Sequence, residues 1–204
     1  MVRQFPVPVL EVGKETKVLC HTKHTWYDFY KLIYACSGIG GVSHGALATG
    51  VQTTVAVDRN PRMTKLHQVH SNAEVVTGEV GHPQVISELW KKSEHAAMMS
   101  AGYSCQPFSQ LGDQRGGCDP CAQTLPHVLR AAFFLQIRVL VLECVVPARS
   151  DSFVQQQIDQ FAQLMQYRVE VANLDLQTVW PCRRHRTWWV IYDPSLGKLV
   201  SLNG

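Results

Sequence analysis

Short runs of apolar and β-branched residues alternate along the chain with segments whose apolar residues recur at helical spacing. Runs of this length without strict alternation are typical of strands buried on both faces of a sheet. Strands are expected at residues 32–36, 53–57, 74–76, 96–101, 139–142, 168–172 and 187–192. Helices are expected at 42–49, 61–70, 83–90, 121–136 and, after a capping Asp151, up to Tyr167.

The regular alternation of strand and helix decides the fold class. Parallel strands need helical crossovers, which cover the faces of the sheet. We therefore predict an α/β fold, doubly wound, with a mostly parallel sheet and helices on both faces. Residues 1–30, in which prolines interrupt the apolar pattern, are expected to be a lead-in of uncertain structure, and residues 31–204 one domain.

The composition excludes some classes of protein but does not indicate a function. The 204 residues are 46% hydrophobic and 17% charged, and the net charge of +3 is too small to indicate a nucleic-acid partner by itself. We find no signal peptide and no run near the roughly 20 apolar residues of a membrane helix. We expect a soluble protein with free thiols in a reducing compartment. Cys20, His21 and His24 could suggest a metal site, but surface histidines are the commoner explanation, and we predict none.

Glycines follow the first predicted strand, where the chain turns into a helix. Gly38, Gly40 and Gly41 would let the backbone approach a ligand closely, although their spacing is not the dinucleotide fingerprint. Asp58 ends the second strand 20 residues after Gly38, which suits ribose hydroxyls, and Glu79 follows the third strand, within reach of an adenine amino group. Taken separately, the glycines could form an ordinary turn, and the two acids could be solvated surface carboxylates. At consecutive strand ends they favour a nucleoside-bearing cofactor.

The next two strand ends carry Cys105 and Glu143. A thiolate nucleophile beside a carboxyl group that can donate a proton is a plausible pair for covalent catalysis. Alternatively, Cys105 is a small packed side chain and Glu143 a capping or salt-bridged acid.

The segment Arg183-Arg184-His185-Arg186 is densely basic and precedes the last predicted strand. It could simply be solvated. In an extended segment, however, Arg184 and Arg186 share one face, so both can reach the crevice while the opposite face meets phosphates or solvent.

Motifs in a fixed order now give the chain a family resemblance. In chain order they are Ser37-Gly38-Ile39-Gly40-Gly41, Val57-Asp58-Arg59-Asn60-Pro61, Thr77-Gly78-Glu79-Val80, Gly102-Tyr103-Ser104-Cys105-Gln106-Pro107-Phe108-Ser109, Glu143-Cys144-Val145 and Pro181-Cys182-Arg183-Arg184-His185-Arg186. This set resembles the cytosine carbon-5 DNA methyltransferases, which use S-adenosylmethionine and have a Rossmann-like methyltransferase sheet. The Cys-Gln-Pro-Phe-Ser string is the most specific part.

The resemblance implies a mechanism. Cys105 would attack carbon 6 of a cytosine flipped from DNA, Glu143 would bind and protonate N3, and Arg184 and Arg186 would orient the base and its phosphate. The cofactor-binding residues implied are Ser37, Gly38, Ile39, Gly40, Gly41, Asp58, Arg59, Glu79 and Val80. A transfer-RNA methyltransferase of the same architecture is an alternative, as is a catalytically weak remnant that binds cofactor or nucleic acid.

The chain departs from the family pattern at several positions. Ser104 stands where the family has proline, Cys144 where it has asparagine, Cys182 where it has glutamine and Cys121 where arginine is usual. We find no target-recognition region and no final Gly-Asn motif, so a protein partner could supply recognition. The location expected from the substrate is nuclear in a eukaryote and cytoplasmic in a bacterium.

Overall fold

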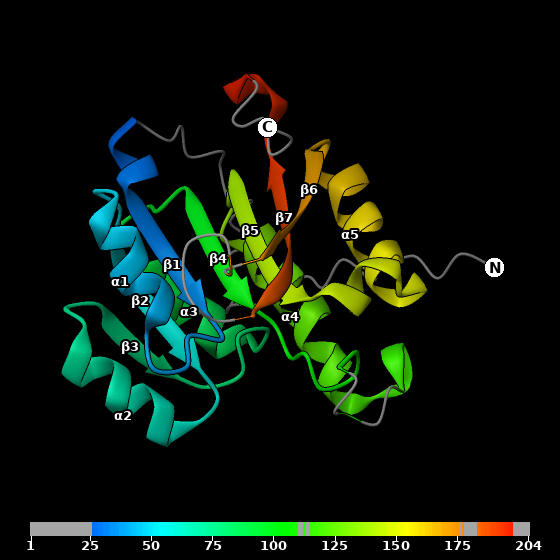
Figure 1. Cartoon of the computed structure of the whole chain (residues 1–204). Helices are drawn as coiled ribbons and strands as arrows, with labels where there is room; N and C mark the ends of the chain where they lie inside the picture. Colours follow the sequence, from blue (N-terminus) through cyan, green and yellow to red (C-terminus); the bar gives the residue numbers. More distant parts are fainter. Residues whose placement is uncertain (1–25, 110–111, 113–114, 176, 178–182, 198–204) are drawn as a thin grey trace.

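A single mixed sheet organises the part of the chain that the computed structural model describes, which is residues 26–109, 112, 115–175, 177 and 183–197 (Figure 1). Its seven strands lie in the order β3-β2-β1-β4-β5-β7-β6. The strands are β1 (Lys31–Ala35), β2 (Gln52–Asp58), β3 (Glu74–Thr77), β4 (Met98–Gly102), β5 (Val139–Val145), β6 (Arg168–Asp175) and β7 (His185–Tyr192). The first five are parallel, and β7 runs antiparallel to both of its neighbours. This arrangement confirms the predicted fold class.

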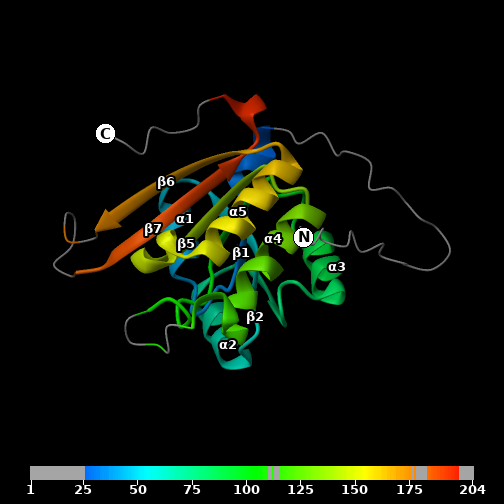
Figure 2. The same cartoon turned by 90° about the vertical axis from the view of Figure 1, so that its right-hand side faces the viewer.

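Helices cover both faces of this sheet. They are α1 (Gly41–Ala48), α2 (Pro61–His70), α3 (Pro83–Lys92), α4 (Thr124–Phe134) and α5 (Ser152–Met165). Short 3₁₀ segments are η1 (Trp26–Tyr30), η2 (Gly116–Cys118), η3 (Pro120–Gln123), η4 (Val146–Ser150) and η6 (Pro194–Leu196). Figure 2 shows α3, α4 and α5 on one face of the sheet and α1 on the other. Among the described helices, none is long and apolar enough to cross a membrane.

The core is centred on the face that carries α3, α4 and α5. One row of side chains crosses five neighbouring strands in register: Val55, Ile33, Met99, Leu140 and Ile191. Each is fully buried. Burying a side chain of this size stabilises the fold by about 1.5–3 kcal/mol before conformational entropy is counted. The row therefore fixes the register that brings the strand ends together.

Several element boundaries differ from those expected, and each has a local cause. The strand predicted from Ala96 begins at Met98, because the Ala96 amide bonds to the Ser93 carbonyl in a turn and the Ala97 amide bonds to the Asp28 carbonyl in η1. The strand expected to stop before Glu143 continues to Val145, because β7 pairs with it up to that residue. In the helix expected from Cys121, the first turn is η3 and α4 begins at Thr124.

The end of the expected lead-in packs against the sheet. In η1, the Asp28 carbonyl accepts a hydrogen bond from the Ala97 amide, and the Arg138 guanidinium lies 5.6 Å from the centre of the Phe29 ring. These contacts attach residues 26–30 to β4 and β5. Residues 1–25, with Cys20, His21 and His24, lie outside the described residues.

Candidate active site

The glycine turn between β1 and α1 has an unusual backbone. Cys36, Gly38 and Gly40 all have positive φ, at 53°, 51° and 98°. Such angles are strained for residues with a Cβ, which explains why glycine occupies positions 38 and 40. The Gly38 amide donates to Asp58 Oδ2 at 2.8 Å, and the Asn60 amide donates to Asp58 Oδ1 at 2.8 Å. The acid expected beside the turn is therefore bonded to it.

Two neighbouring residues of the turn have contrasting environments. The Ser37 side chain is buried, and its hydroxyl lies 3.1 Å from Nδ1 of His67 on α2. Ile39 is 57% exposed. A Cβ placed on Gly38 or Gly41 would meet nothing within 4 Å, so the turn has an open side.

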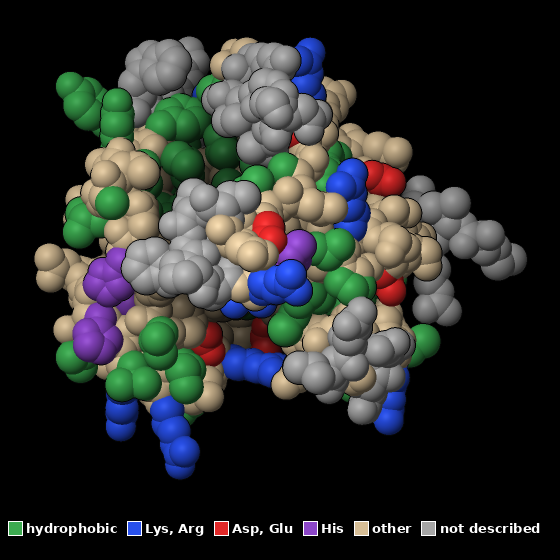
Figure 3. Space-filling model, viewed as in Figure 1, with side chains coloured by type: hydrophobic (Ala, Val, Ile, Leu, Met, Phe, Trp, Pro, Cys, Tyr) green, Lys and Arg blue, Asp and Glu red, His purple; other side chains and the backbone are tan. Residues whose placement is uncertain are grey.

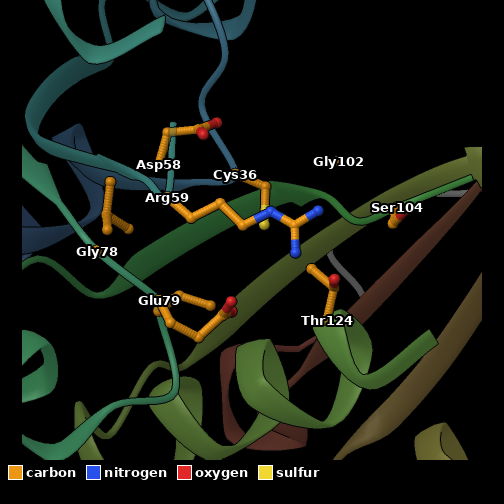
Figure 4. A pocket seen from close by; sticks show the side chains of 10 residues that line it. Cys36, Asp58, Arg59, Gly78, Glu79, Gly102, Ser104 and Thr124 are labelled. Carbon is orange, nitrogen blue, oxygen red and sulfur yellow. The ribbon is translucent and has the colours of Figure 1, made fainter. Parts of the chain in front are cut away.

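A pocket of about 170 Å³ lies where the parallel strands end (Figure 4). It is lined by Cys36, Val57, Asp58, Arg59, Gly78, Glu79, Val80, Gly102, Ser104 and Thr124. It brings together four of the predicted cofactor residues, which are Asp58, Arg59, Glu79 and Val80. Sequence reasoning did not select Cys36, Gly102, Ser104 and Thr124 as cofactor residues, although Cys36 directly precedes the predicted glycine turn.

Both charge signs and apolar side chains line this pocket. Arg59 extends across it in Figure 4. Glu79 Oε1 lies 3.2 Å from Nδ1 of His127. Burial, together with the negative charge of Asp58, raises the pKa of the Cys36 thiol to about 12. That thiol is therefore neutral at physiological pH and adds an uncharged wall to the pocket.

The predicted nucleophile lies on a tight turn three residues after β4. Cys105 is exposed, and its carbonyl accepts from the amides of Phe108 and Ser109. Phe108 is buried and meets the Tyr103 ring edge-on at 6.3 Å. The turn thus has an apolar anchor under an exposed thiol. Because Gly102 and Ser104 line the pocket, the nucleophile turn adjoins the candidate cofactor site.

Glu143 lies beside this turn and is held by two arginines. It pairs with Gly102 in the parallel register of β4 and β5. Its Oε1 accepts from Arg186 Nε at 2.9 Å and from Arg184 Nη2 at 3.2 Å. Its Oε2 would lie 3.2 Å from a Cβ on Gly102, so the missing side chain leaves room for the carboxylate. The structure thus brings together three of the four predicted catalytic residues, Glu143, Arg184 and Arg186, even though Arg184 precedes the strand.

The departures from the family pattern fall in different surroundings. Cys144 is buried, and burial raises the pKa of its thiol to about 12. Cys121 follows Asp119, whose carboxylate accepts from its amide. Cys182 lies outside the described residues. Within the described part, no group of three or more metal-ligating side chains gathers.

The molecular surface in Figure 3 shows two further features on the face seen in Figure 1. Acidic and basic side chains border a hollow in its lower middle part. Hydrophobic side chains and histidines gather at the lower left, where Figure 1 places α1 and α2. Exposed apolar residues there are Ile39, Leu47, Leu66 and Val69.

Known proteins support this picture of the fold. No curated protein matches the chain by sequence. Similar solved structures include a putative DNA modification methyltransferase encoded within a prophage of E. coli, with TM-score 0.68 and 21% identity over 84% of this chain and 49% of that one. The S. pombe Dnmt2 methyltransferase has TM-score 0.63 and 15% identity over 79% and 50%. The Entamoeba histolytica methyltransferase EhMeth has TM-score 0.66 and 18% identity over 84% and 55%. The chain thus spans about half the length of these proteins.

A family model gives the sequence-level assignment. The model described as C-5 cytosine-specific DNA methylase matches residues 30–200, which include every predicted site residue. The motifs that carry the resemblance, between residues 37 and 186, all lie within this match. The chain therefore belongs to the C-5 cytosine-specific DNA methylase family.

Proposed function

We propose that this chain is the catalytic part of an S-adenosylmethionine-dependent methyltransferase that acts on carbon 5 of cytosine in DNA through a covalent Cys105 adduct. One observation carries the proposal: the exposed thiol of Cys105 follows directly on Ser104, which lines the pocket, and Glu143 lies beside the same turn. A nucleophile, a carboxyl group and a cofactor pocket at one sheet edge are the parts that this chemistry needs.

The pocket residues fit an S-adenosyl group. Each Asp58 oxygen accepts one amide and retains capacity for a ribose hydroxyl, because a carboxylate offers about four acceptor positions. Glu79 can accept from an adenine amino group, and Val57 and Val80 supply apolar walls. S-adenosylmethionine, when bound, would supply the methyl group. At about 170 Å³ the described pocket is smaller than the ~300–1,000 Å³ of most ligand sites.

The protein's own groups would act on the base in a balanced sequence. The Cys105 thiolate attacks carbon 6 of a cytosine flipped from the helix while the Glu143 carboxyl group gives a proton to N3. Carbon 5, now electron-rich, takes the methyl group. A water molecule takes the carbon 5 proton, the electron pair of that bond re-forms the double bond and expels the thiolate, and N3 returns its proton to Glu143. Arg184 and Arg186 hold Glu143 in place through Oε1. The family resemblance implies that they would also orient the base and its phosphate.

A mechanism-based trap tests this proposal. DNA containing 5-fluorocytosine is incubated with the protein and S-adenosylmethionine, because fluorine at carbon 5 blocks the final elimination. We expect a covalent complex that survives denaturation and is absent in Cys105→Ala. Cys118→Ala is the matched control, since Cys118 is also an exposed cysteine on the loop after β4. An adduct that persists in Cys105→Ala and disappears in Cys118→Ala would contradict the assignment.

The same trap separates the alternatives. Transfer RNA carrying 5-fluorocytosine, used in place of DNA, would form the adduct if RNA is the substrate. The prophage protein of similar fold is described as a DNA modification methyltransferase, which supports testing DNA first. A wild-type protein that binds S-adenosylhomocysteine in calorimetry but forms neither adduct would favour a binding remnant, or a chain that needs a protein partner for target recognition.

A further inference from the structure

A histidine that the proposed chemistry does not use lies beneath the glycine turn. His67 belongs to α2 and is fully buried. Its Nδ1 lies 3.1 Å from the Ser37 hydroxyl in the turn, and its Nε2 lies 3.1 Å from the Ser43 hydroxyl on α1. One ring therefore bridges the beginning of the turn and the helix that follows it.

The ring also fills the space under Gly40. A Cβ on Gly40 would lie 2.8 Å from the ring's Cδ2, closer than real Cβ contacts come. On another side, the Tyr34 ring of β1 meets the imidazole edge-on with centroids 6.1 Å apart. The turn therefore rests on the imidazole at Gly40 and is bonded to it at Ser37.

We propose that His67 is a positioning residue for the cofactor turn: its two ring nitrogens fix Ser37 relative to Ser43, and so hold the Gly38 amide toward Asp58. This inference rests on the proposed function, because it assigns a role in binding the S-adenosyl group. A neutral imidazole offers one donor and one acceptor on a rigid frame, and serine hydroxyls can rotate to complement either.

The neutral form of the ring is the one that this site favours. The titratable groups that influence it are His44 on α1, Asp58 at the end of β2 and Tyr34 on β1. Burial and, after it, the charge of His44 lower the pKa of His67, against an opposing effect of Asp58. The ring is therefore neutral at physiological pH, as a one-donor, one-acceptor bridge requires.

Two substitutions at the same position separate the two contacts. The side-chain amide of asparagine can occupy the place of Nδ1, whereas that of glutamine reaches the place of Nε2. His67→Asn thus keeps a partner for Ser37, and His67→Gln keeps one for Ser43. We expect His67→Gln to weaken S-adenosylhomocysteine binding about tenfold in calorimetry, and His67→Asn to stay within about threefold of wild type. His70→Asn and His70→Gln are matched controls, because His70 lies exposed on the same helix.

A second readout needs no cofactor. The Gly40 amide donates to the Ser37 carbonyl at 3.0 Å, so its hydrogen exchange reports how firmly the turn is held. We expect faster exchange in His67→Gln than in His67→Asn. In wild-type protein observed by NMR, the Gly38 and Gly40 amide resonances should shift as the His67 ring titrates, which tests the bridge even if a variant does not fold.

These measurements distinguish a failure of the positioning role of His67 from a failure of the proposed function. Equal affinity and equal exchange in both variants would overturn the positioning role, whether both match wild type or both are impaired alike. Turn amides that ignore the titration of His67 would do the same. A wild-type protein that fails to bind S-adenosylhomocysteine would instead contradict the proposed function, while the exchange and NMR measurements would still judge the role of His67.

Discussion

The Gly38 amide donates a 2.8 Å hydrogen bond to Asp58 Oδ2, which joins the turn after β1 to the end of β2. The other oxygen of the same carboxylate accepts from Asn60, the residue whose side chain caps α2. Asp58 therefore holds two loops at the place where it also lines the pocket. Its structural and binding roles coincide, so changing it should affect both.

Asp58→Asn is expected to weaken cofactor binding by about tenfold or more and to lower the free energy of unfolding by about 1–3 kcal/mol. An amide retains one acceptor oxygen, and its NH₂ group faces the second backbone donor, so one of the two hydrogen bonds is lost. Calorimetry with S-adenosylhomocysteine and urea unfolding measure the two effects. Asp159→Asn, an exposed acid on α5, is the control and should change neither. Unchanged binding in Asp58→Asn would rule the carboxylate out as a ribose contact.

Much of the sheet edge that carries the pocket could be predicted from sequence, because the end of a strand can be recognised from neighbouring residues alone. The 20-residue interval between Gly38 and Asp58 corresponds to one β-α-β step, and parallel pairing places its ends together. Alternation of side chains likewise placed Arg184 and Arg186 on one face that reaches the crevice. Their contact with Glu143 was not predicted, because it depends on the antiparallel pairing of β5 with β7.

His67 could not be predicted in the same way. Nothing in the pattern of Lys65, Leu66, Gln68 and Val69 marks His67 as the buried residue among them. The ring is buried because Tyr34, Ser37, Gly40 and Ser43, from other elements, lie against it. Gly102 belongs to the predicted nucleophile motif, but neither it nor Thr124 was predicted to line the cofactor pocket, because they do so through the packing of β4 and α4. Contacts between elements leave no periodic pattern in one sequence.

Glu143→Gln is expected to reduce turnover by about a hundredfold or more while leaving cofactor affinity within a few-fold of wild type. Glutamine keeps the shape of the side chain but cannot give a carboxyl proton to N3 or balance two guanidinium charges. Steady-state methyl transfer to DNA measures the loss. Glu88→Gln, an exposed acid on α3, serves as the comparison and should retain full activity. Wild-type turnover in Glu143→Gln would remove Glu143 from the mechanism.

The two arginines should differ in importance. The Arg186 side chain is 23% exposed and donates through Nε, whereas the Arg184 side chain is 49% exposed. Screening by water weakens an exposed pair more, so Arg186→Lys should reduce turnover more than Arg184→Lys. A double variant with Glu143→Gln should show non-additive losses for Arg186. The opposite ranking would mean that Arg184 acts mainly on substrate rather than through Glu143.

Thiol reactivity should separate the cysteines of the site. Burial and Asp58 raise the pKa of Cys36 to about 12, so at pH 8 its thiol is almost entirely protonated and unreactive. Cys144 is buried with its pKa raised to about 12 as well. Iodoacetamide at pH 8 should therefore modify the exposed Cys105 and Cys118 first, as peptide mass spectrometry can show. Rapid modification of Cys36 in folded protein would contradict its place in the pocket wall.

The stability of the protein should depend on pH through His67. Its pKa is lowered in the folded state from the ordinary 6.5, so as pH falls below that value the unfolded chain takes up a proton that the folded state resists. The stabilising effect is thus complete above pH 6.5 and is lost as the pH falls toward the lower folded pKa. Urea unfolding at pH 7.5 and pH 5.5 should show a smaller loss in His67→Asn than in wild type. His70→Asn should keep the wild-type loss, because His70 is exposed on the same helix. If both variants lose the same unfolding free energy between pH 7.5 and pH 5.5, protonation of His67 does not cause the loss of stability in acid.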